Sequence, residues 1–120
     1  MKNKFSMTIL FCAWLLAAWF MLPQHALADP PKDIALGYDM PTQTLTVTIT
    51  HKSSFTGMHY IKQVAIKKNN EPADIKSYTS QTGKETFAYT YKVPAAPNDV
   101  LEVTVTCNIQ GSKTATLKVE

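Results

Sequence analysis

Within residues 29–120, the histidine and cysteine side chains, which are of types that bind transition metals, are His51, His59 and Cys107. Imidazole suits iron, copper and zinc, and a thiolate donates strongly enough to tune a redox metal. A cysteine bound to a metal is deprotonated, so a metal site also explains why a cysteine is present without a disulfide partner. The spacing places each of these residues near the end of an expected strand. It indicates one metal site built from several chain segments.

Period-two alternation of apolar and polar residues predicts the strands that carry these ligands. Leu45, Val47 and Ile49 alternate with threonines, and Asn69-Asn70 and Gly111-Ser112 are turn signals between such runs. Short alternating strands at this spacing favour an immunoglobulin-like antiparallel β-sandwich of about seven strands, with a small closed barrel as the alternative. The strands are expected at residues 34–38, 44–50, 60–68, 75–79, 87–92, 101–108 and 115–119.

Loops at the ends of a sandwich present ligands without interrupting its core. His51 follows one expected strand, His59 begins the next, and Cys107 ends a later one. We expect the three side chains to converge at one end of the sandwich. The alternative is two surface histidines and a buried, inert core thiol, which is the usual environment of a free cysteine.

The first 28 residues have the pattern of a signal peptide. Lys2 and Lys4 precede an uncharged apolar run at residues 5–22, and Ala26-Leu27-Ala28 is a small-residue cleavage site. Cleavage after Ala28 predicts an exported domain, periplasmic or secreted, at residues 29–120. An uncleaved N-terminal anchor is the alternative, because the run has roughly the shortest length that spans a bilayer.

Composition excludes several classes of function. Residues 29–120 keep ten lysines against nine acidic residues, a net charge of +1, and the chain has no arginine. This predicts no binding of nucleic acid and, once the leader is cleaved, none of membranes. Cys107 is the one cysteine of residues 29–120, so no internal disulfide is expected. No Ser-His-Asp set or phosphate loop indicates a hydrolase, and the oligomeric state has no sequence signal.

Two short motifs resemble the iron-binding region of the superoxide reductase (desulfoferrodoxin) family. They are His59-Tyr60-Ile61 and Cys107-Asn108-Ile109-Gln110-Gly111. In that family a Cys-Asn-x-His-Gly loop supplies a thiolate and an imidazole to one iron, and a His-Tyr-Ile segment supplies another imidazole. The resemblance covers roughly residues 34–119 in strand pattern and motif order.

The resemblance implies a non-haem ferrous iron held by imidazoles in a plane and one axial thiolate. His51, His59 and Cys107 are the metal ligands that it assigns to this chain. It further implies reduction of superoxide, a small anionic oxidant, to hydrogen peroxide, with an electron donor protein as partner. A lysine near the site would draw in the anion.

The chain departs from the family pattern at two places. Gln110 stands where the family has histidine, and the family's Glu-Lys-His segment has no counterpart before His51. The ligand set is therefore incomplete, and the catalytic electronics of the family are not preserved. Two further interpretations stay open, a metal-free binding or structural module and a copper- or zinc-binding periplasmic protein. Met40 and Met58 are the residues that suggest copper.

Overall fold

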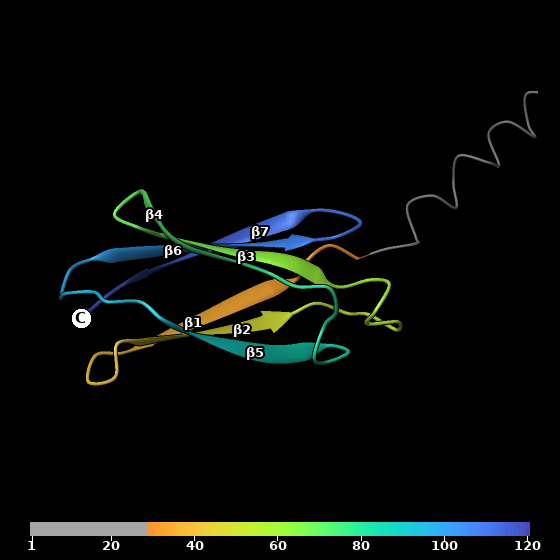
Figure 1. Cartoon of the computed structure of the whole chain (residues 1–120), viewed down its shortest axis with the longest axis horizontal. Helices are drawn as coiled ribbons and strands as arrows, with labels where there is room; N and C mark the ends of the chain where they lie inside the picture. Colours follow the sequence, from red (N-terminus) through yellow and green to blue (C-terminus); the bar gives the residue numbers. More distant parts are fainter. Residues whose placement is uncertain (1–28) are drawn as a thin grey trace, which may run out of the picture.

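The computed structural model describes residues 29–120, which form two antiparallel sheets packed face to face (Figure 1). The expected signal peptide, with its cleavage after Ala28, lies outside the described residues. The strands are β1 (Asp33–Asp39), β2 (Thr44–Thr50), β3 (Ile61–Lys68), β4 (Glu71–Ser77), β5 (Thr86–Lys92), β6 (Val100–Cys107) and β7 (Ser112–Lys118).

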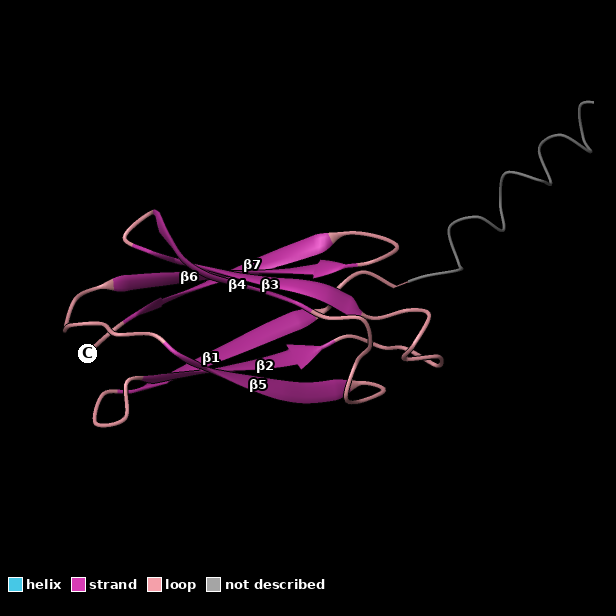
Figure 2. Cartoon of the chain, in the orientation of Figure 1, coloured by secondary structure: helices cyan, strands magenta, loops and turns pink. Residues whose placement is uncertain are grey.

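One sheet has the strand order β1-β2-β5 and the other β4-β3-β6-β7 (Figure 2). This confirms the immunoglobulin-like sandwich, and the barrel alternative is wrong because the two sheets remain separate. Residues 29–120 contain no helix that is long and apolar enough to cross a membrane.

Side chains that alternate along the strands form the core between the sheets. Leu45, Val47 and Ile49 of β2 are fully buried, while the threonines between them are partly exposed. From the other sheet, Val64 of β3 and Val105 of β6 are also fully buried. Each such side chain stabilises the fold by about 1.5–3 kcal/mol relative to its exposed state. The alternation that predicted the strands is therefore the pattern of burial.

Turns at one end of the sandwich, among them the predicted Asn69-Asn70 turn, contain residues with left-handed backbone conformations. Asn69 and Asn70 have φ of 53° and 68°, and Asn98 has φ of 75°. Asparagine tolerates this region better than most residues, because its short side chain forms local hydrogen bonds. These turns lie at the end of the sandwich opposite the histidines, where they close the β3–β4 and β5–β6 connections.

The fourth strand is displaced from its expected position. Residues 75–79 were expected, whereas β4 runs over Glu71–Ser77 and leaves Ile75 57% exposed. The reason is that β4 is an edge strand, and one face of an edge strand need not be apolar.

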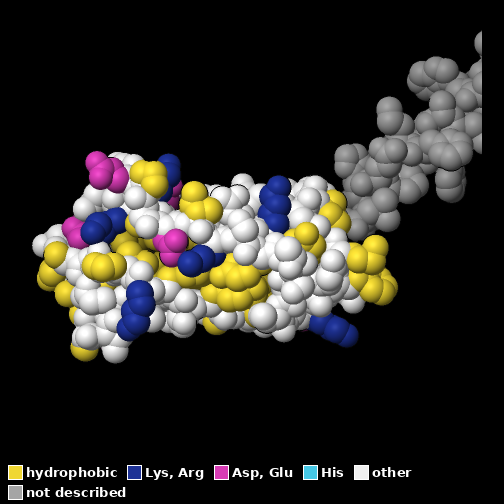
Figure 3. Space-filling view, viewed as in Figure 1, with side chains coloured by type: hydrophobic (Ala, Val, Ile, Leu, Met, Phe, Trp, Pro, Cys, Tyr) yellow, Lys and Arg dark blue, Asp and Glu magenta, His cyan; other side chains and the backbone are white. Residues whose placement is uncertain are grey.

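On the face of the molecule seen in Figure 3, apolar surface between the two sheets is visible among scattered charged side chains.

Candidate functional site

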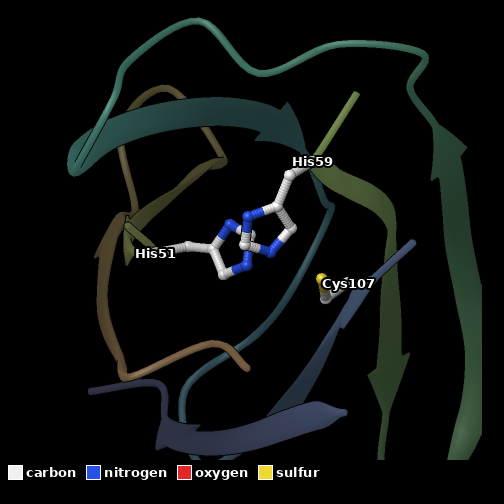
Figure 4. Close-up of side chains that lie close together, drawn as sticks. All are labelled: His51, His59 and Cys107. Carbon is white, nitrogen blue, oxygen red and sulfur yellow. The ribbon is translucent and has the colours of Figure 1, made fainter. Parts of the chain in front are cut away.

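His51, His59 and Cys107 lie together at one end of the sandwich (Figure 4). One ligand atom from each side chain lies within 4.8 Å of the others. The two imidazole rings meet edge to face, with centroids 4.6 Å apart and planes inclined at 72°. The predicted convergence of these residues is therefore present in the structure, and their role as metal ligands stays a prediction.

His51 follows β2 directly and is fully buried. Its backbone N–H donates to the carbonyl of Glu85 at 2.8 Å, which ties the end of β2 to the β4–β5 connection. The ring Nδ1 lies 2.7 Å from Oε1 of Gln81, and the ring Nε2 lies 2.9 Å from the backbone oxygen of Asp29. Each ring nitrogen therefore has an oxygen atom of the protein within 2.9 Å.

Gln81 sets the tautomer of this ring. Its Nε2 donates to the carbonyls of His51 at 2.8 Å and Gly83 at 2.7 Å, and its Oε1 accepts from the N–H of Ile61 at 3.2 Å. These contacts assign the amide orientation, so Oε1 faces Nδ1 as an acceptor. The proton of a neutral His51 ring is then on Nδ1, and Nε2 carries the lone pair that a metal needs.

His59 lies at the end of the β2–β3 connection and is half-buried. Its N–H donates to the carbonyl of Phe55 at 2.8 Å, and its own carbonyl accepts a hydrogen bond from the hydroxyl of buried Ser53. The ring Nε2 lies 3.2 Å from the Asp29 carbonyl oxygen. A compact turn therefore positions this ring beside that of His51, with one side open to solvent.

Cys107 is the last residue of β6, is 3% exposed and carries a free thiol. The N–H of Ile109 donates to Sγ at 3.4 Å, and the Cys107 N–H donates to the carbonyl of Gly111 at 3.0 Å. The turn after β6 thus both orients the sulfur and supplies it with a donor.

Asn108 joins the cysteine turn to the histidine loop. Its Oδ1 accepts from the N–H of Tyr60 at 2.9 Å, and its Nδ2 donates to the carbonyl of Met58 at 3.0 Å. The Asn108 N–H also donates to the Tyr60 carbonyl at 3.0 Å. Nearby, the pairing of β3 with β6 shifts register between Ile61 and Gln63, a bulge of the kind found beside functional sites.

Several lysines, methionines and aromatic residues, and Gln110, lie outside this cluster. Gln110, Lys52 and Lys62 are exposed. Met58 is 75% exposed, and Met40 packs against the core from the β1–β2 turn at the other end of the sandwich. The methionines that suggested copper therefore do not join the histidines. Of the aromatic residues, Phe87 and Tyr91 belong to the core, and Tyr89 stacks on Tyr78.

The donor atoms fit one metal ion after a small adjustment. Ligands at about 2.0–2.3 Å from a tetrahedral ion lie roughly 3.5 Å apart. The side chains of His51, His59 and Cys107, within 4.8 Å of one another, need to close by about an ångström. Beside the cluster, an open depression of about 380 Å³ is lined by Asp29, Pro30, Pro31, Lys32, Thr50, Lys52 and Glu85.

Comparisons with known proteins found distant similarities in structure. No family model and no curated protein matches the sequence. A variant of the superoxide reductase (neelaredoxin) from Ignicoccus hospitalis matches with a TM-score of 0.46 and 16% identity, over 79% of this chain and 83% of that one. The superoxide reductase (neelaredoxin) of the same organism matches with a TM-score of 0.44 and 12% identity, over 76% and 83% of the two chains.

At these TM-scores the likeness carries no argument about function, and membership of the superoxide reductase family stays a prediction. Sequence reasoning missed Gln81, Asn108 and Asp29. Of these three residues, only Asn108 had a signal in the sequence, because it lies within the cysteine motif. Gln81 and the Asp29 carbonyl reach the site from 30 and 22 residues away from His51, without a motif.

Proposed function

We propose that residues 29–120 form an exported metal-binding domain in which His51, His59 and Cys107 hold one ferrous iron for a redox role. The observation that carries the proposal is the approach of two imidazoles and one thiol to within 4.8 Å at one end of the sandwich. Two features of the surroundings support it. The Gln81 Oε1 lies at Nδ1 of His51, so Nε2 carries the lone pair when the ring is neutral, and the Ile109 amide donates to the sulfur.

Iron bound there supplies one-electron chemistry, and a thiolate ligand raises its electron density. The chain's own residues supply access and charge. His59 is half-buried, so a small molecule can approach its side of the cluster. Lys32 and Lys52 line the adjoining depression, where positive charge attracts a small anion. Superoxide is the anionic oxidant that we propose, since one electron and two protons convert it to hydrogen peroxide, and a separate protein would return the electron.

Export is part of the same proposal. The basic residues Lys2 and Lys4, the apolar run at residues 5–22 and the Ala26-x-Ala28 site support secretion with cleavage after Ala28. Mass determination of the N-terminus of the chain purified from its producing cells tests the cleavage. A chain that still begins at Met1 would contradict it.

The decisive experiment measures the amount of metal bound per chain. The protein is expressed from a gene that encodes residues 1–120, leader included, and is purified without oxygen. We expect about one iron per chain after ferrous loading, and a thiolate-to-iron absorption band on oxidation. Replacing Cys107→Ala should remove the band. Val105→Ala is the matched control, because it truncates a buried side chain of the same strand and should leave the band unchanged.

Less than about a tenth of an equivalent after ferrous loading would contradict iron binding and leave a metal-free module. Zinc or copper at one per chain, with no iron uptake, would support the metal site and contradict the redox role. A band that survives Cys107→Ala would show that the thiolate is not a ligand.

A further inference from the structure

The backbone carbonyl of Asp29 points at both histidines of the cluster. Its oxygen lies 2.9 Å from Nε2 of His51 and 3.2 Å from Nε2 of His59. The Asp29 side chain takes no part in these contacts. One main-chain oxygen from the segment before β1 therefore lies where the two imidazoles converge.

The polarity of this contact is unusual. Because Gln81 Oε1 accepts the proton on Nδ1 of His51, the Nε2 of the neutral ring is an acceptor, and it faces a carbonyl oxygen that is also an acceptor. Two lone pairs at this distance repel each other unless a proton or a metal ion lies between them. A metal ion bound by Nε2 and by this oxygen would remove the repulsion.

The segment that carries this carbonyl is held in place. The N–H of Lys32 donates to the carbonyl of Thr50 at 2.8 Å, and Pro31 is buried. Pro30 packs against Gly111, so closely that a Cβ on Gly111 would lie 2.7 Å from Pro30 Cβ. The proline pair restricts the backbone on either side of the carbonyl. The oxygen is therefore positioned before any ion binds.

We propose that the Asp29 carbonyl oxygen is a fourth ligand of the metal site, beside His51, His59 and Cys107. This inference rests on the proposed function, because it needs an ion at that cluster. The resulting set would supply two nitrogens, one sulfur and one oxygen to the ion without Gln110. A carbonyl oxygen is a hard ligand, so the set favours a divalent ion over cuprous copper.

The test observes this carbonyl directly. Asp29-Pro30 is the only Asp-Pro pair in the sequence. Labelling aspartate with ¹³C at the carbonyl and proline with ¹⁵N therefore gives one carbon signal with a one-bond coupling to nitrogen. Zinc serves as the diamagnetic probe. It is added to the protein that cells produce from the gene for the full chain. We expect this signal and the ring nitrogen signals of His51 and His59 to shift together and to saturate at about one equivalent.

Two outcomes would overturn the inference, and they differ in what else they affect. If the histidine nitrogen signals shift and the Asp29 carbonyl signal does not, the fourth ligand is wrong and the proposed metal site stands. If neither set of signals shifts at saturating zinc, the fourth ligand and the proposed metal site are both wrong.

A variant tests the same contact without a label. Gly111→Ala places a Cβ against Pro30 at a backbone φ of 78°, so it should displace the Asp29 carbonyl. We expect the zinc dissociation constant to rise by about tenfold. Gly37→Ala is the matched control, since no atom lies within 4 Å of its added Cβ, and its constant should not change. A folded Gly111→Ala protein with unchanged affinity would contradict the inference, and if this variant does not fold the labelled carbonyl decides.

Discussion

Oε1 of Gln81 lies 2.7 Å from Nδ1 of His51, and this contact joins the β4–β5 connection to the end of β2. Both residues are among the few buried polar ones of residues 29–120, at 4% and 0% exposed. The same glutamine donates to the His51 carbonyl. One side chain therefore controls the position of the histidine backbone, the orientation of its ring and the nitrogen that faces the cluster.

Replacing Gln81→Leu should lower the free energy of unfolding by about 3 kcal/mol, because the N–H of Ile61 and the His51 carbonyl lose a buried partner. Urea unfolding measures this loss. The ring ¹⁵N shifts of His51 should also change from the Nδ1–H tautomer to a mixture. An unchanged tautomer in the folded variant would show that Gln81 does not set it.

Replacing Asn108→Ala should weaken zinc binding by about tenfold, because the cysteine turn loses its side-chain bonds to Tyr60 and Met58. Unfolding free energy should fall by about 1–3 kcal/mol. Isothermal titration gives the affinity and urea unfolding the stability.

Asn69→Ala is the matched control for Asn108→Ala. Asn69 makes a comparable clamp at the other end of the sandwich, where its Oδ1 accepts from the N–H of Val100 at 2.9 Å and its Nδ2 donates to Asp99 at 3.0 Å. It should cost stability and leave zinc affinity unchanged. Equal losses of affinity in both variants would mean that Asn108 acts only through global stability.

Stability should decline in alkaline solution because of Tyr91. Burial raises the pKa of this hydroxyl above its ordinary value of 10.0, and its bond to the Tyr78 hydroxyl at 2.8 Å raises it further. The unfolded chain then loses the proton first, so the contribution is complete below about pH 10 and is lost as pH rises above it. Tyr91→Phe should flatten the decline in the free energy of unfolding between about pH 9 and pH 11, the range in which a tyrosine of the unfolded chain loses its proton. Urea unfolding measures this decline. A decline of unchanged slope in the variant would rule out this origin.

Truncation of an apolar side chain should be costly only where that side chain faces the core. Leu45→Ala removes a fully buried side chain and should reduce the unfolding free energy by about 2–5 kcal/mol. Ile75→Ala, on the edge strand and 57% exposed in the native protein, should cost about 1 kcal/mol or less. Equal losses would contradict the assignment of β4 to an edge.

The fold class could be predicted from the sequence because strand periodicity and turn chemistry are local. The alternation at Leu45, Val47 and Ile49 reports burial on one face, and asparagines at the turns report left-handed backbone. The position of β4 was missed because edge exposure depends on neighbouring strands. The pattern around Ile75 contains no information about whether another strand lies beside it.

For the candidate site, the residue types could be predicted from the sequence, since His51, His59 and Cys107 are recognisable by their chemistry and by their place at expected strand ends. Only the tertiary structure decided that these residues meet, that Gln81 sets the His51 tautomer and that the Asp29 carbonyl faces both rings. The physical reason is that hydrogen bonds and ligand convergence depend on distances across the sandwich. A backbone carbonyl has the same chemistry at every residue, so only its place in the fold distinguishes it.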